Sequence, residues 1–258
     1  MRKLLVLLLL SPTLLFAQKA FDGTWLMNLE SAEVKGNDKF GLKKGTYWCS
    51  TCVPKIEVKA DGQDHKVADS PYFETLNIRE VNDHTVEIEA KKAGNVVSTN
   101  KLIASDDGKT LATEYMFKTE GGQTGTGKYQ SERVGVASQG AHLISGEWHA
   151  LKLENASDSI RTVTYKASED DLSMTDQIGD SYTAKFDGKD YPYKGDPGVT
   201  TVSLKKIDAN TIEETDKLNG KVIFVSRMTV SPDGKTITNN TEDKRRGLKF
   251  KSQMEKQQ

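Results

Sequence analysis

Hydrophobic and charged residues alternate along much of the chain, and a period of two predicts strands with one buried face. In the segment 85–91, Val86, Ile88 and Ala90 alternate with two glutamates and a lysine. Clusters such as Ala93-Gly94-Asn95 and Asp107-Gly108 follow the apolar runs and predict tight hairpin turns. The pattern predicts strands near 23–29, 54–60, 64–67, 73–81, 85–92, 96–104, 110–118 and 127–134, and again near 146–153, 161–167, 171–175, 181–187, 200–207, 211–217, 221–230, 235–242 and 248–254.

The chain also contains an internal duplication, which fixes the domain organisation that we expect. Asp61-Gly62-Gln63-Asp64 recurs 126 residues later as Asp187-Gly188-Lys189-Asp190, and 105–110 recurs as 231–236 at the same spacing. A Gly-x-Trp segment opens each unit, with Trp25 in the first and Trp148 in the second. Short strands without a long crossover favour barrels. We therefore expect an all-β protein of two tandem antiparallel up-and-down β-barrels, spanning 18–136 and 137–258.

The first 17 residues have the pattern of a cleaved secretory signal. Arg2 and Lys3 precede the apolar run 4–10, and Ala17 is a small residue in front of the polar Gln18. The run is too short to span a bilayer. We expect residues 1–17 to be a signal peptide and the mature protein to be periplasmic or extracellular.

Composition excludes several classes of function. The 258 residues carry 36 Lys+Arg against 37 Asp+Glu, for a net charge of −1, so no basic field for nucleic acid is expected. Charged residues make up 28% of the chain and aromatic residues only 7%. The first figure argues against a polytopic membrane protein, and both argue against an outer-membrane barrel with an apolar outer band.

A resemblance to known proteins rests on a few segments. Phe21-Asp22-Gly23-Thr24-Trp25 resembles the Gly-x-Trp opening strand of lipocalins and fatty-acid-binding proteins. The whole chain resembles a family of uncharacterised exported bacterial proteins with duplicated lipocalin-like units, through the segments 47–54, 181–192 and 230–236. The resemblance implies lipocalin-like barrels and carries no assigned activity.

Cys49 and Cys52 are the only cysteines. In an oxidising compartment we expect them to form a local structural disulfide. A redox-active dithiol is the alternative, but that chemistry favours a helix N-terminus, whereas the flanking residues indicate loop and strand. A zinc site would need further ligands, which the four scattered histidines do not supply at a usual spacing.

Two further motifs are interpreted as turns. The segment 122–128 nearly matches a phosphate-binding loop, but Tyr129 stands where Ser or Thr is needed, and strands flank it on both sides. The loops at 61–64 and 187–190 bring two Asp each, too few oxygens for a calcium site. A weak ion site is the alternative there. We expect no metal and no cofactor.

The strand phases differ between the two units in one respect that bears on function. Where the first unit has Val86, Ile88 and Ala90, the second has Ile212, Glu214 and Asp216. If this phase points inward, the second barrel contains two carboxylates. Arg227 or Lys206 would be their partner, and the group could anchor the head of an amphipathic ligand. An edge strand with both carboxylates solvated is the alternative.

Trp25 and Trp148 are expected to be structural plugs that close one end of each barrel. No Ser-His-Asp or Cys-His arrangement is evident, so we expect no catalytic residues and no enzyme. We expect a soluble binding protein for a small apolar or amphipathic ligand, without stable membrane insertion. A structural or interaction protein of the cell envelope with filled barrels is one alternative, and a Cys-x-x-Cys redox protein is another.

Overall fold

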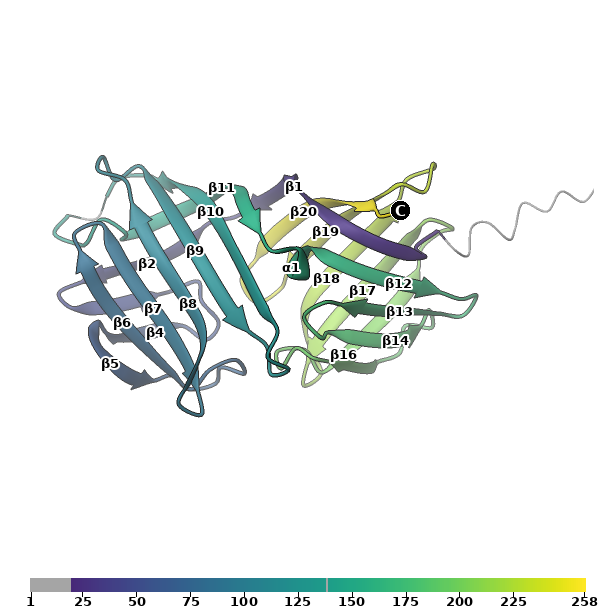
Figure 1. Cartoon of the computed structure of the whole chain (residues 1–258), viewed down its shortest axis with the longest axis horizontal. Coiled ribbons are helices and arrows are strands. Elements are labelled where there is room, and N and C mark those ends of the chain that lie inside the picture. Colours follow the sequence, from purple (N-terminus) through teal and green to yellow (C-terminus); the bar gives the residue numbers. More distant parts are fainter. Residues whose placement is uncertain (1–19, 138) are drawn as a thin grey trace, which may run out of the picture.

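The computed structural model describes residues 20–137 and 139–258, so the expected signal segment lies outside the described residues. The described chain is almost entirely strand, with one short helix, α1 (Asp158–Arg161) (Figure 1). The strands that precede this helix are β1 (Gly23–Lys35), β2 (Asp38–Lys43), β3 (Thr46–Cys49), β4 (Ile56–Lys59), β5 (Asp61–Lys66), β6 (Thr75–Asn82), β7 (Thr85–Lys92), β8 (Asn95–Ala104), β9 (Thr110–Lys118), β10 (Thr124–Val134) and β11 (Gly146–Ala156). Those that follow it are β12 (Thr162–Ala167), β13 (Asp171–Asp176), β14 (Ser181–Lys185), β15 (Tyr191–Lys194), β16 (Thr201–Lys206), β17 (Thr211–Leu218), β18 (Lys221–Val230), β19 (Thr236–Asp243) and β20 (Leu248–Lys256).

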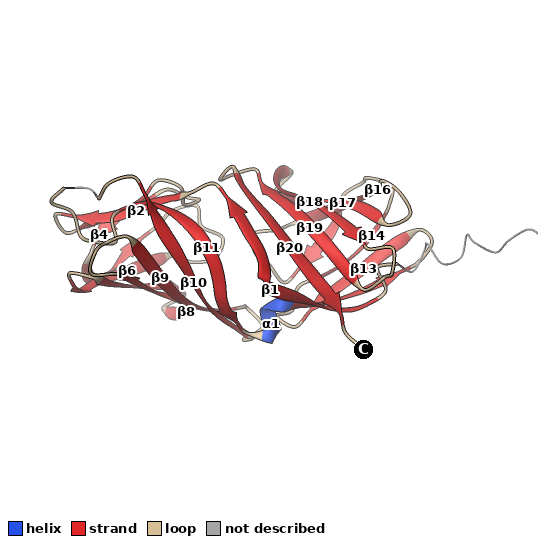
Figure 2. Cartoon of the chain, turned by 90° about the horizontal axis from the view of Figure 1, so that it is seen from above, coloured by secondary structure: helices blue, strands red, loops and turns tan. Residues whose placement is uncertain are grey.

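The strands form two antiparallel sheets of ten strands, which lie side by side (Figures 1 and 2). One sheet, here called the second barrel, is closed and runs β1-β12-β13-β14-β15-β16-β17-β18-β19-β20. The other, the first barrel, runs β4-β3-β2-β11-β10-β9-β8-β7-β6-β5 and is barrel-like, with β4 and β5 as its edges. The expected all-β architecture of two antiparallel barrels is confirmed at this level.

The first strand of each repeat belongs to the barrel of the other repeat. In β1, Trp25 pairs with Val163 of β12 and with Lys256 of β20. In β11, Trp148 pairs with Arg133 of β10 and with Asp38 of β2. The boundary expected between residues 136 and 137 therefore separates two units of sequence, whereas the two sheets each draw on both units.

Alternation places one set of side chains inside each barrel. In β7, Val86, Ile88 and Ala90 are buried, as the pattern predicts, and they join the core of the first barrel. In the second barrel the corresponding phase of β17 begins with the buried Ile212. The phase that begins with Val86 in the first unit and Ile212 in the second therefore points inward in both barrels.

Three short strands were not predicted. β2 and β3 lie in a segment with three lysines and two glycines between 38 and 46, which masks the alternation. β15 contains Pro192, which cannot donate a backbone hydrogen bond and reads as a turn. β1 also runs to Lys35, beyond the expected 23–29, with an irregularity between Asn28 and Glu33 in its pairing with β20.

Two hairpin turns carry each repeat to the mouth of the other barrel. The turn between β19 and β20 brings Arg245 and Arg246 to the first barrel, where both line its cavity. The turn between β9 and β10 brings Thr119 and Glu120 against loops of the second repeat. The spacing of the duplication superimposes Thr119 on Arg245 and Glu120 on Arg246. The corresponding turns, 119–123 and 244–247, differ in length, and the turn is cationic in the second repeat but carries Thr119 and Glu120 in the first.

Candidate functional site

Glu214 and Asp216 lie on the inner face of the second barrel. Glu214 is paired in the sheet with the buried Leu204, and Asp216 with the buried Val202. The hydroxyl of Tyr182, from β14, which is separated from β17 by β15 and β16 in the sheet, donates a hydrogen bond to the Glu214 carboxylate. One oxygen of Asp216 is buried without a hydrogen-bond partner among the described residues. Of the two arrangements that the sequence leaves open for this pair, the structure has the inward one.

Burial governs the protonation of this pair. It raises the pKa of Glu214, and it raises the pKa of Asp216, which the nearby charge of Glu214 raises further. The pKa of the Tyr182 hydroxyl is also raised, by burial first and then by the charge of Glu214. The pair consequently favours the protonated form well above the pH at which free carboxyls ionise.

Arg227 does not join Glu214 and Asp216. It is paired with Glu213 in the sheet and is exposed, so it lies on the outer face of β18, where it lines a shallow surface pocket with Glu33 and Lys249. Lys206, the other cation considered, is exposed at the end of β16. Arg227 occupies the opposite phase of its strand from the inward residues, whereas Lys206 shares the phase of Val202 and Leu204 but lies at the exposed end of β16, opposite Ile212.

The first barrel contains a cavity of about 450 Å³. Its walls include the inward apolar side chains of Leu76, Ile88, Ala90 and Leu102. Residues of the second barrel, among them Phe224, Phe250, Arg245 and Arg246, complete the lining at the side where the two barrels meet. A volume of this size falls within the range of small-molecule sites in proteins.

Polar groups inside this cavity are incompletely satisfied. Thr113 is only 2% exposed and lines the cavity; its hydroxyl makes no hydrogen bond of standard geometry among the described residues, and it lies beside the Tyr129 phenol, whose pKa it lowers. Tyr47 and Tyr129 line the same cavity. Burial is the main cause that raises the pKa of both phenols, so both remain neutral donors at physiological pH. A buried hydroxyl without a partner costs free energy unless something else in the cavity satisfies it.

An ion pair between the repeats stands at the mouth of the cavity. Arg246, from the β19–β20 turn, donates a hydrogen bond to the carboxylate of Asp38 at the start of β2. The guanidinium of Arg245 lies over the ring of Phe224, with its Cζ atom 4.9 Å from the ring centroid. The cationic turn of one repeat therefore covers the opening of the other repeat's barrel.

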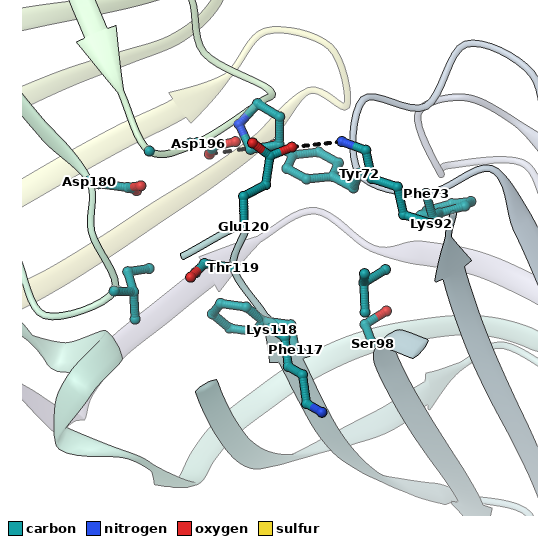
Figure 3. Close-up of a pocket in the computed structure, with 14 residues that line it drawn as sticks. Tyr72, Phe73, Lys92, Ser98, Phe117, Lys118, Thr119, Glu120, Asp180 and Asp196 are labelled. Carbon is teal, nitrogen blue, oxygen red and sulfur yellow. Dashed lines mark hydrogen bonds and ion pairs between the residues drawn. The ribbon is translucent and has the colours of Figure 1, made fainter. Parts of the chain in front are cut away.

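A second hollow lies between the repeats, at the loops of the second barrel (Figure 3). It has a volume of about 470 Å³. The first repeat contributes Tyr72, Phe73, Lys92, Val97, Ser98, Phe117, Lys118, Thr119 and Glu120, and the second contributes Ile178, Asp180, Gly195, Asp196 and Pro197. We call this hollow the inter-repeat groove. Sequence reasoning missed it because its two walls are more than 50 residues apart in the chain and come together only through the packing of the barrels.

Two glycines allow this packing. A side chain at Gly198 would bring its Cβ atom within 1.9 Å of the Tyr72 hydroxyl, so the first repeat approaches the second only because this position lacks one. At Gly195, where φ is +104°, a Cβ atom would lie 2.4 Å from a carboxylate oxygen of Asp180. The loop conformation that carries Asp180 and Asp196 into the groove therefore requires glycine.

Trp25 and Trp148 are both buried at matching places in the two barrels. Each indole N–H donates a 2.8 Å hydrogen bond to the carbonyl four residues earlier, from Trp25 to Phe21 and from Trp148 to Ile144. The Cζ atom of Arg133 lies 4.2 Å from the centroid of the Trp148 ring, and the Nζ atom of Lys256 lies 5.2 Å from that of Trp25. Neither tryptophan lines the first-barrel cavity, the inter-repeat groove or the surface pocket beside Arg227.

Cys49 and Cys52 form a disulfide, as expected. Cys49 ends strand β3 and Cys52 lies in the bend that follows, so the pair stands at a strand end and not at a helix N-terminus. Both residues line the first-barrel cavity. The disulfide thus belongs to the wall of the cavity.

The glycine-rich and Asp-Gly segments have structural explanations. Gly125 and Gly127 lie within strand β10, and a Cβ atom at Gly127 would lie 2.3 Å from the Tyr115 ring. The expected loop is therefore shorter, because a strand begins at Thr124. In the Asp-Gly segments, Asp64 pairs with Lys91 at 2.8 Å and Asp190 pairs with Lys217 at 2.6 Å, an ion pair repeated by the duplication.

The described residues contain no helix that is long and apolar enough to cross a bilayer. Nor do they contain a group of three or more His, Cys, Asp or Glu side chains placed to hold a metal ion. No model of a known protein family matches the chain, and no curated protein matches its sequence.

Proposed function

We propose that the protein is an exported, non-enzymatic binding protein that holds a small amphipathic molecule in the cavity of the first barrel. The observation that carries this proposal is the hydroxyl of Thr113, which is buried inside a cavity of about 450 Å³ and makes no hydrogen bond of standard geometry within the described residues. A ligand that hydrogen-bonds this hydroxyl would remove the cost of leaving it unsatisfied.

The walls favour an elongated ligand with one polar end. Leu76, Ile88 and Leu102 offer an apolar surface, whereas Thr113 and Tyr129 offer neutral hydroxyls on facing positions of β9 and β10. Burial of apolar surface supplies most of the affinity in such sites, and a few polar groups fix the orientation. The charges at the mouth are already paired with one another, since Arg246 contacts Asp38.

Native mass spectrometry of protein purified from its own cell envelope tests the proposal. A co-purifying small molecule is the expected result. A fluorescence titration with N-phenyl-1-naphthylamine, an uncharged apolar probe at neutral pH, measures binding to the recombinant protein. Ala90→Phe places a phenyl group in the cavity and should lower the affinity at least tenfold.

Ala112→Phe is the matched control, since Ala112 lies on β9 next to Thr113 but on the opposite face of the strand. Near-ultraviolet circular dichroism verifies that both variants are folded. If both variants bind the probe with equal affinity and no ligand co-purifies, the proposal is wrong. The better interpretation is then a structural or interaction protein whose barrels are filled by side chains.

A further inference from the structure

The two carboxylates of the inter-repeat groove lack cationic partners. Asp180 accepts a 3.2 Å hydrogen bond from the Tyr193 hydroxyl, and Asp196 accepts one of 2.6 Å from the backbone N–H of Gly198. None of the ion pairs within residues 20–137 and 139–258 involves either carboxylate. Both are therefore held by neutral donors only, on a wall of an otherwise apolar hollow.

The cations nearby are engaged or directed elsewhere. Arg245 lies beside Tyr72, whose hydroxyl is 3.5 Å from Asp196, but its guanidinium stacks over Phe224 and lies 3.7 Å from the Asp243 carboxylate. The ammonium of Lys92 pairs with Glu120 at 2.8 Å and also donates to the carbonyl of Pro71 at 3.2 Å. Lys118 is exposed, and in Figure 3 its chain extends away from Asp180 and Asp196. Glu120 and Lys92 compensate each other, so Asp180 and Asp196 remain against the single exposed lysine, Lys118. The groove therefore has an excess of negative charge.

More acidic groups stand behind the groove. Asp176, at the end of β13, accepts the backbone N–H of Asp180 at 2.8 Å. Tyr193, which binds Asp180, packs against Tyr182 with the ring centroids 5.9 Å apart, and Tyr182 in turn binds Glu214. The groups of the second repeat that face Asp180 are thus carboxyls or phenols, and none of them carries a positive charge.

Comparison of the two repeats shows that the inter-repeat groove lacks a cation that is present at the mouth of the first barrel. At the mouth of the first barrel, Arg246 of the second repeat neutralises Asp38. The corresponding residue of the first repeat, Glu120, lies at the mouth of the second barrel and cannot neutralise its carboxylates. A cation that the chain supplies at one end is absent at the corresponding position of the other.

We propose that the inter-repeat groove binds a small organic ammonium ion with an apolar body, its charge beside Asp180 and Asp196 and its body between Phe73 and Phe117. The site is separate from the proposed ligand cavity of the first barrel. Charge-assisted hydrogen bonds to two carboxylates, in a hollow whose remaining walls are largely apolar, favour an ammonium over a neutral or anionic group of the same size.

Binding of an ammonium ion in this groove should also release a proton from Asp180. Burial, with the charges of Asp176 and Asp196, raises the pKa of Asp180 to about 7. At neutral pH part of the protein therefore carries a protonated Asp180. An ammonium ion that enters the groove favours the carboxylate, so the carboxyl proton is released to solvent while the ammonium keeps all of its own protons.

Isothermal titration with octylammonium chloride, 1-octanol and sodium octanoate tests the proposal, since the three probes share one alkyl chain and differ in charge. The titrations use the full-length mature protein and its Ala90→Phe variant, in which the first-barrel cavity is filled. We expect octylammonium to bind Ala90→Phe at least tenfold more tightly than octanol, and octanoate not to bind. Loss of octylammonium binding in Ala90→Phe would place the probe in the first barrel and overturn the proposal.

Asp180→Asn and Asp196→Asn should each weaken octylammonium binding at least fivefold. Asparagine still offers an oxygen to Tyr193 or to the backbone, so these variants preserve the loop. Asp106→Asn, at an exposed turn of the first repeat, changes the net charge equally and should bind as wild type does. Titration in two buffers with different ionisation enthalpies should show proton release in wild type and none in Asp180→Asn. Unchanged binding in both variants, or octanol bound as tightly as octylammonium, would overturn the proposal.

Discussion

Arg246, near the C-terminus, donates a hydrogen bond to Asp38, near the N-terminus, and this contact joins the turn of one repeat to the barrel of the other. Both side chains are about one-third exposed or less, with 28% exposure for Arg246 and 35% for Asp38. Removing one partner leaves the other charge partly desolvated and unpaired.

Arg246→Met should therefore lower the free energy of unfolding by about 1–3 kcal/mol. Lys244→Met, in the same turn, is the matched control, because Lys244 is more exposed and its partner Glu242 has a second lysine, Lys249. Urea unfolding followed by tryptophan fluorescence measures both. A variant at position 246 that is as stable as the one at 244 would contradict a stabilising contact between the repeats.

Trp25→Ala should create a cavity in the second barrel and destabilise the protein by about 3–5 kcal/mol. Because β1 belongs to the second barrel, we also predict which strands lose protection in this variant. Hydrogen exchange monitored by mass spectrometry should show lost protection in β12 and β20, the partners of β1, before β2 and β10. Trp148→Ala should show the reverse order. The opposite distribution would mean that each repeat keeps its own first strand.

The buried carboxylates predict how stability changes with pH. Burial raises the pKa of Glu214 and Asp216 in the folded protein, whereas free carboxyls titrate near about 4. The folded state therefore holds protons that the unfolded chain releases. This contribution to stability is fully present below about pH 4 and is lost as the pH rises through the raised pKa values.

The free energy of unfolding of the wild type should accordingly decline from mildly acid to alkaline pH. The double variant Glu214→Gln, Asp216→Asn should show a weaker decline, because its amides do not ionise. Glu213→Gln, on the neighbouring outward position of β17, should leave the wild-type slope unchanged. Parallel slopes for all three proteins in urea titrations from pH 5 to pH 9 would show that the pair titrates normally.

Thr113→Val removes the unpartnered hydroxyl and retains the shape of the side chain. We expect the ligand-free variant to be more stable than wild type by about 1 kcal/mol, because a buried polar group without a partner is replaced by a methyl group. Thermal unfolding in the absence of ligand measures this gain. Thr99→Val, on an outward position of β8, should change stability little. A destabilised Thr113→Val variant would indicate that the hydroxyl is satisfied within the protein.

Replacement of both cysteines by alanine removes a disulfide that closes a very short loop. On the loop-entropy argument the cost should be about 2 kcal/mol. The disulfide also lines the first-barrel cavity, so the loss should be confined to that barrel. Hydrogen exchange should increase in β3 and β4 and remain unchanged in β14 and β16. Faster exchange throughout both barrels would contradict this.

Much of the fold follows from the alternation of residues. β7 spans 85–92 in both the prediction and the structure, whereas aligning the repeats left both an inward and a solvated arrangement open for Glu214 and Asp216. The position of Arg227 could not be derived in this way. Its phase depends on how β18 pairs with β17, and this pairing sets Arg227 opposite Glu213.

The exchange of first strands is invisible in the sequence for a different reason. Gly23-Thr24-Trp25 and Gly146-Glu147-Trp148 carry nearly the same pattern, so either strand suits the gap in either barrel. Only the lengths and directions of the connections decide between the two pairings. The inter-repeat groove and its carboxylates follow from the same packing, and for this reason no local motif indicates them.

The pairing of β1 with β20 sets a condition on the order of folding. Residues 25–28 meet residues 253–256, nearly the full length of the described chain away. The second barrel therefore closes only once β20 is made, while β1 emerges from synthesis before any of its neighbours. Until β12 follows, β1 has neither of its partners in the sheet, and its backbone groups are free to pair with other chains.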